Sequence, residues 1–272
     1  MRPNSRISIK LSSWLSIITP LFFFITSAYG IITLQKTDVA KQSQQKNLVD
    51  YHQNETTEMQ SLQLLRKIPS LGFQNVISDW VYLNFIQYFG DTEVREKIGY
   101  GLCPDYFTTL VSKDSKFTNA VIIMDVCTAI FAGEPFESLQ KLQLSAKSLQ
   151  PQMDAVTVRS YYVWRAIGIN QLLFQGQPLK AAESYKKAVA FAEKYNDEDS
   201  HRFIENMKRS ITYLTNNPNS KMAQIGAWVN VLNTNPDPKT LQRVIKEIEL
   251  LGGKVQKIEA GGFNVKLPPE TN

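Results

Sequence analysis

The chain has 272 residues, of which 43% are hydrophobic and 20% charged, the composition of an ordinary folded protein. Its formal net charge is +5, but Arg2, Arg6 and Lys10 lie in residues 1–34, which contain no acidic side chain. Without these three, the remainder of the 30 basic groups nearly balances the 25 acidic groups. Such a balance argues against a nucleic-acid-binding protein, which concentrates positive charge on its folded part.

The first 34 residues combine this basic leader with an uncharged run, Leu11–Leu34. As a helix the run spans about 36 Å, enough for a hydrocarbon core of about 30 Å. We interpret residues 11–34 as a single transmembrane anchor that places the main domain outside the cytoplasm, in the periplasm or a lumen. A signal peptide cleaved near residues 26–28 or 28–30 is the alternative, and it places the domain on the same side.

Three further segments follow the anchor. Residues 35–60 are rich in Gln, Lys, Asn and Glu and have no sustained apolar stripe, so they are predicted to form a polar stalk. Residues 61–235 show helical periodicity and are predicted to form an array of paired helices. Residues 236–272 form a C-terminal module of different character.

The array is centred on Tyr161–Tyr195, which predicts two antiparallel helices joined at residues 175–178. The second helix has one apolar stripe, at Ala181, Tyr185, Ala188, Ala192 and Tyr195. The first helix is apolar on two faces and therefore needs neighbours on two sides. Small residues let the backbones approach closely, and large rings fill the space between them.

This alternation of large and small side chains resembles a tetratricopeptide repeat. The residues that carry the resemblance are Trp164, Gly168, Gly176, Ala181, Tyr185 and Ala188. The last four match the spacing of the family, whereas the first two keep their mutual spacing but lie one residue early. The resemblance implies an α-solenoid that binds other proteins.

A second helical hairpin precedes this one. Residues 105–111 predict a short helix, 117–131 a strongly apolar helix and 137–149 a further helix. Gly133-Glu134-Pro135 parallels Gly176-Gln177-Pro178 at a spacing of about 43 residues, longer than the roughly 34 of a regular tetratricopeptide unit. The array is therefore either a divergent repeat with an insertion or a general stack of helical hairpins.

Residues 73–91 are the most apolar segment after the anchor, but polar residues interrupt them throughout. This pattern predicts the first core helix of the array and excludes a second membrane span. A docking surface or polar site at Asp79, Trp80 and Tyr82 is the functional alternative. The segment looks similar to the opening of membrane-anchored repeat proteins of cyanobacteria and plastids.

The chain contains two cysteines, Cys103 and Cys127, whose wide spacing argues against a zinc site. We interpret them as buried free thiols. A disulfide is the alternative if the domain faces an oxidising compartment.

Few residues suggest a catalytic or metal-binding site. The histidines are His52 and His201, and the sequence shows neither a Gly-rich loop after a strand nor a nucleophile elbow. Acidic residues 197–199 beside His201 suggest a metal site, but acids before a helix are explained by capping and the helix dipole. We predict no catalytic, cofactor-binding or metal-binding residues, and a protein that is not an enzyme.

The C-terminal module begins with a helix that Asp237 is placed to cap, with Pro238 at its first position. Residues 255–258 and 263–267 look extended, and the second run alternates apolar and polar side chains. The module is predicted to be a helix followed by a β-hairpin. It either covers the open end of the array or forms a docking site of its own.

Together these patterns predict a mainly α protein: a membrane-tethered, tetratricopeptide-like solenoid that acts as a protein-binding scaffold. By analogy with members of that class in photosynthetic membranes, its partner is expected to be a membrane protein complex whose assembly or maintenance it assists. The alternative is an extracytoplasmic binding protein for a cell-envelope component or a small ligand.

Overall fold

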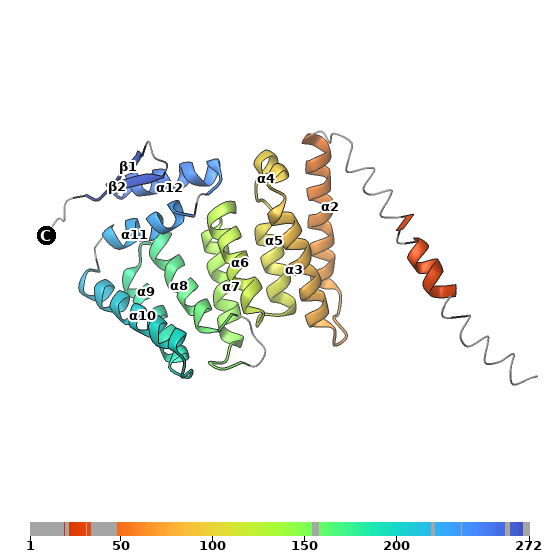
Figure 1. Ribbon diagram of the computed structural model, residues 1–272, viewed down its shortest axis with the longest axis horizontal. Coiled ribbons are helices and arrows are strands. Elements are labelled where there is room, and N and C mark those ends of the chain that lie inside the picture. The colour runs from red at the N-terminus through yellow and green to blue at the C-terminus, as the bar shows by residue number, and fades with distance from the viewer. Residues whose placement is uncertain are drawn as a thin grey trace, which may run out of the picture. The chain divides into compact units, whose positions relative to one another are not determined.

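The computed structural model is mainly helical and ends in a small two-stranded antiparallel sheet (Figure 1). It describes residues 19, 22–30, 32–33, 48–153, 158–218, 221–234, 236–258 and 262–268. The chain divides into two units, Met1–Tyr51 and His52–Asn272. The elements are α2 Leu48–Lys67, α3 Gln74–Gly90, α4 Thr92–Ile98, α5 Cys103–Lys113, α6 Thr118–Val126, the π-helix η1 Cys127–Ala132, α7 Pro135–Ser148, α8 Tyr161–Leu173, α9 Pro178–Ala192, α10 Glu198–Asn216, α11 Lys221–Leu232, α12 Pro238–Leu250, β1 Lys254–Lys257 and β2 Phe263–Lys266.

In the unit Met1–Tyr51, residues 22–30 are helical. Thr26 Oγ1 donates a hydrogen bond to the carbonyl of Phe22 at 2.9 Å, one helical turn earlier. Much of the predicted anchor, residues 11–34, lies outside the described residues. Among the helices that the structure describes, none combines the length and the apolar character needed to cross a membrane.

The helix α2 occupies part of the segment that the sequence indicates as a polar stalk, residues 35–60. Tyr106 Oη on α5 donates to Glu58 Oε1 at 2.7 Å, and Leu62 is buried. The sequence predicts a stalk that is at most partly helical, and residues 48–60 of this segment are helical. Polar contacts help to hold this helix in place, and apolar periodicity cannot reveal contacts of that kind.

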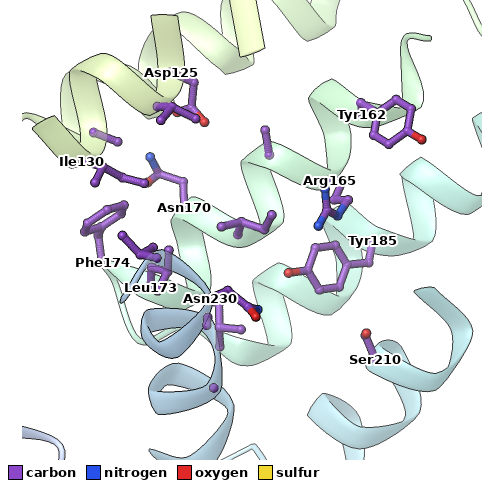
Figure 2. A pocket seen from close by; sticks show the side chains of 18 of the residues that line it. Asp125, Ile130, Tyr162, Arg165, Asn170, Leu173, Phe174, Tyr185, Ser210 and Asn230 are labelled. Carbon is purple, nitrogen blue, oxygen red and sulfur yellow. The ribbon is translucent and has the colours of Figure 1, made fainter. Parts of the chain in front are cut away.

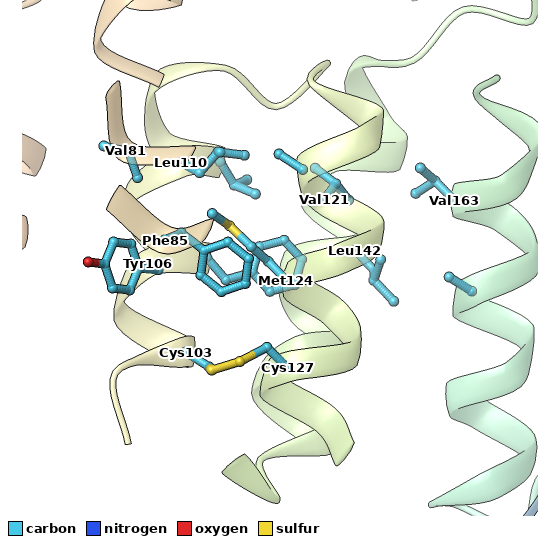
Figure 3. Close-up of a cluster of buried hydrophobic side chains, with 14 of the residues drawn as sticks. Val81, Phe85, Cys103, Tyr106, Leu110, Val121, Met124, Cys127, Leu142 and Val163 are labelled. Carbon is cyan, nitrogen blue, oxygen red and sulfur yellow. A yellow bond between two sulfur atoms is a disulfide. The ribbon is translucent and has the colours of Figure 1, made fainter. Parts of the chain in front are cut away.

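The first hydrophobic cluster joins α3, α5, α6 and α7 (Figure 3). Phe85 of α3 meets Tyr106 of α5 edge to face, with ring centroids 5.6 Å apart. Leu110, Met124 and Leu142 fill the space between the helices and are fully buried. This cluster is the core of the array's first half.

A disulfide joins Cys103, at the start of α5, to Cys127, the first residue of η1 (Figure 3). Their Cα atoms are 5.7 Å apart and both side chains are buried. The expectation of free thiols is therefore corrected. The two cysteines meet because α5 packs against α6 and η1, a tertiary contact that their separation of 24 residues does not reveal.

The two predicted hairpins, α6–η1 with α7 and α8 with α9, have turns of the same geometry. The glycine takes a left-handed conformation in each, with φ of 80° at Gly133 and 57° at Gly176. The residue after each glycine donates its N–H to the carbonyl six residues earlier, at 2.9 Å and 3.0 Å. A proline then opens the next helix. This combination of left-handed glycine and six-residue bond satisfies carbonyls at the end of a helix.

The C-terminal helices pack over the ends of these two hairpins. Gln224 of α11 donates to the carbonyl of Leu172 at 2.9 Å, and Arg243 of α12 donates to the carbonyl of Ile130 at 2.6 Å. Both acceptors lie in the last turn of a helix, where carbonyls lack helical partners. The helices α11 and α12 thereby bind the ends of α8 and η1.

The predicted cap of α12 is confirmed, because Asp237 accepts bonds from the N–H groups of Lys239 and Thr240 at 3.0 Å and 3.1 Å. The predicted hairpin is also present, with Val255 paired to Val265 in the antiparallel register. Its half-buried side chains pack against the hydrophobic cluster around Trp228.

Candidate functional site

The helical unit contains a cavity of about 1140 Å³ between α8, α10 and α11 (Figure 2). It forms because α11 packs against α8 and α12 while α10 packs against α9, so that α10 and α11 diverge. Ile169 and Leu173 of α8 and Ile130 of η1 are among its apolar lining residues. Large apolar cavities with few polar groups are the usual sites of ligand binding.

Two charged residues, one on the first helix of each hairpin, reach this cavity. Asp125 is the only charged residue in the apolar run 117–131, and Arg165 is the only one in residues 161–174. Both line the cavity. Neither residue is among the candidates that the sequence predicts, although a lone charge in an apolar helix is a usable signal.

The π-helix η1 shapes one wall. Ala129, Ile130 and Phe131 lie in this segment and line the cavity. A π-helical turn changes the direction of the side chains relative to the preceding α-helix, and such turns are frequent at functional sites. The disulfide at Cys127 ties the start of this wall to α5.

Asp125 lies half-buried where α6 meets α7 and α8. Ser138 Oγ of α7 donates to its Oδ1 at 2.6 Å. Burial raises the pKa of Asp125 to about 7, and the hydrogen bonds from Ser138 and Asn170 only partly oppose this rise. The carboxyl group therefore changes charge near neutral pH.

Arg165 and two tyrosines form the opposite side of the cavity. Figure 2 shows Arg165 on α8 lying between Tyr162 and Tyr185. Burial raises the pKa of Tyr185 to about 12, and the positive charge of Arg165 partly offsets this effect. The site thus presents a cation and phenolic hydroxyls beside an apolar surface.

No known protein family, no characterised protein and no solved structure matches this chain. Within the described residues, no group of three or more His, Cys, Asp or Glu side chains is placed to hold a metal ion. In the predicted acidic cluster, Asp197 caps α10 through the N–H of Ser200 at 2.9 Å and pairs with Arg159 at 2.8 Å.

The structure gathers the predicted packing residues at the α8–α9 interface. The Tyr185 ring lies over Gly168, and Ala181 and Ala188 are fully buried. Trp164 is half-buried, with its ring edge to face on Phe191 at 6.1 Å. Together with the turn glycine, these residues shape the helix pair that carries Arg165.

Two of the three predicted docking residues on α3 lie beside one cavity. Asp79 lines a second, more polar cavity of about 850 Å³, which also includes Lys116 and Gln150. Tyr82 packs edge to face on Phe117, with ring centroids 5.1 Å apart. Trp80 is exposed. Asn119 donates to the Tyr82 hydroxyl at 3.2 Å, and both Asn119 and Phe117 line the cavity of Asp79, so Asp79 and Tyr82 lie beside the same cavity.

Asp125 gives a first testable prediction. Because the folded state holds a proton that the unfolded state releases, the free energy of unfolding should fall as the pH rises from about 5 to about 7.5. We expect a loss of about 1–2 kcal/mol, below the full linkage value because the side chain is half-buried. Urea unfolding across this range should show the loss in the wild type and a smaller one in Asp125→Asn. Equal pH dependence in both proteins would contradict the assignment.

Proposed function

We propose that this protein is a membrane-tethered helical scaffold that binds a segment of another protein in the cavity between α8, α10 and α11. The observation that carries the proposal is the cavity itself, which is large, open and mainly apolar. A groove of this kind suits an amphipathic segment whose apolar face is buried on binding. The role we propose is to assist the assembly or maintenance of a membrane protein complex.

The paired helices support the scaffold proposal. The two hairpins have the same turn geometry, and the α8–α9 pair packs a ring against glycine, in the manner of tetratricopeptide repeats. Stacked hairpins of this type offer a preformed surface. Binding of a partner therefore requires little reorganisation of the scaffold, which keeps the free-energy cost of binding low.

The proposed location outside the cytoplasm rests on two observations. The uncharged run Leu11–Leu34 follows a basic leader, which favours an anchor with the main domain across the membrane. The disulfide between Cys103 and Cys127 is typical of proteins in oxidising compartments. A tether would confine the search for a partner to the membrane surface, which raises its effective concentration.

Gly226 allows the groove to be blocked without disturbing the fold. This residue of α11 lines the cavity, and a Cβ atom added there would meet no other atom within 4 Å. Gly226→Trp should therefore fill the groove while α11 keeps or gains helix stability. We expect chemical crosslinking in native membranes to recover at least about tenfold less partner, which corresponds to about 1.4 kcal/mol of binding free energy.

Gly226→Ala is the matched control, because it changes the same backbone position but leaves the groove open. It should retain the crosslinked partner at the wild-type level. Unchanged crosslinking by Gly226→Trp would remove the groove from the proposed function. Native mass spectrometry that finds a bound small molecule, displaced by Gly226→Trp, would instead support the alternative of a binding protein for a small ligand or envelope component.

A further inference from the structure

Within the part of the chain that the structure describes, Arg165 is a cation without an acidic partner. Its side chain is exposed to the cavity, and it forms no ion pair with any Asp or Glu that the structure describes. The other guanidinium group lining the cavity, on Arg209 of α10, lies within 2.5 Å of the side-chain oxygen of Asn206. Arg209 keeps its positive charge, but Asn206 of its own helix already orients its guanidinium group, whereas no hydrogen bond orients that of Arg165 within the described residues. Arg165 is therefore the cation that we consider for an incoming acidic group.

The surroundings of Arg165 favour a strong ion pair. Tyr162 and Tyr185 lie beside it, and Ala166 and Ile169 are its neighbours on the cavity-lining side of α8. A segment that covers this surface would exclude water, so the guanidinium group would lose its hydration. That loss is costly unless the segment supplies a carboxylate, to which a guanidinium can donate two parallel hydrogen bonds.

We propose that the cavity selects a partner-protein segment that carries one Asp or Glu among apolar residues, with the carboxylate paired to Arg165. This inference rests on the proposed function, because it names the chemistry of the segment that the scaffold binds. The apolar residues of the segment would pack on Ile169 and Leu173. Selectivity then comes from the ion pair with Arg165 and affinity from apolar burial.

The test is a selection of short random peptides, displayed on phage, against the full-length protein in detergent. Peptides that also bind Gly226→Trp are removed first, so that only groove-dependent binders remain. The wild type should enrich peptides with one acidic residue flanked by apolar residues. Arg165→Glu, selected in parallel, should enrich a basic residue at the same place, and Arg165→Gln should enrich neither charge.

The outcomes separate the two proposals. Groove-dependent peptides without an acidic preference, or with the same preference on Arg165→Glu, overturn this inference and leave the scaffold proposal standing. A selection that yields no groove-dependent peptide overturns both. Thermal unfolding of the Arg165 variants should match the wild type, since this side chain makes no ion pair in the described fold. The enriched wild-type peptide should bind about tenfold more tightly than its Glu→Gln or Asp→Asn version, as one ion pair of about 1.4 kcal/mol predicts.

Discussion

Gly168→Ala is expected to lower the free energy of unfolding by about 2 kcal/mol, although alanine is the better helix former. A Cβ atom at this position would lie 2.6 Å from Cδ1 of Tyr185 and 3.1 Å from the carbonyl oxygen of Ala181. The Tyr185 ring is buried and cannot move aside freely. The two helices would therefore have to separate, which costs more than the helix propensity returns.

Gly226→Ala is the matched control for this substitution. Both glycines lie in the interior of a helix, but a Cβ atom at Gly226 meets only open space. Helix propensity should raise the free energy of unfolding of the control by up to about 1 kcal/mol. The free energies of unfolding of the two variants should therefore differ by about 3 kcal/mol. Urea unfolding followed by tryptophan fluorescence measures both. A gain in stability at both positions would show that α8 and α9 are not closely packed at Gly168.

The features that the sequence predicts well are those with a local physical cause. Asp237 and Pro238 mark the start of α12 because an Asx cap and a proline each act within one turn. Gly133 and Gly176 mark two turns because both positions need a left-handed backbone. The close packing of α8 on α9 is readable for a similar reason, since small residues recur at helical spacing.

The features that the sequence does not reveal depend on contacts between distant segments. The N-terminal half of α2 lacks an apolar stripe, and its bond from Glu58 to Tyr106 crosses 48 residues. The cavity forms because α11 packs against α8 and diverges from α10. The sequence alone does not distinguish Arg165 from other polar side chains, because only the divergence of α10 and α11 places it in the cavity. The sequence signal for this site is that Asp125 and Arg165 are each the lone charge of an apolar helix.

Removal of the disulfide is expected to lower the free energy of unfolding by about 3 kcal/mol, since it closes a loop of roughly 25 residues in the unfolded chain. Cys103 and Cys127 are both buried, so replacing both by alanine leaves no unpaired polar group. Urea unfolding of the wild type should shift to lower urea in the presence of a reductant. The double alanine variant should unfold at the reduced wild-type midpoint and should not respond to the reductant.

The same reduction should also loosen the cavity, because the bond fixes the first residue of η1 and three later residues of that segment line the site. Hydrogen exchange should therefore increase in residues 127–132 on reduction, whereas α9 should change little. If exchange rises equally in both places, the bond stabilises the unit as a whole and does not specifically order this wall. If exchange rises only in η1, the disulfide between α5 and η1 keeps the cavity preformed. Reduction should then weaken the binding of the selected peptides, because η1 forms the wall opposite Arg165.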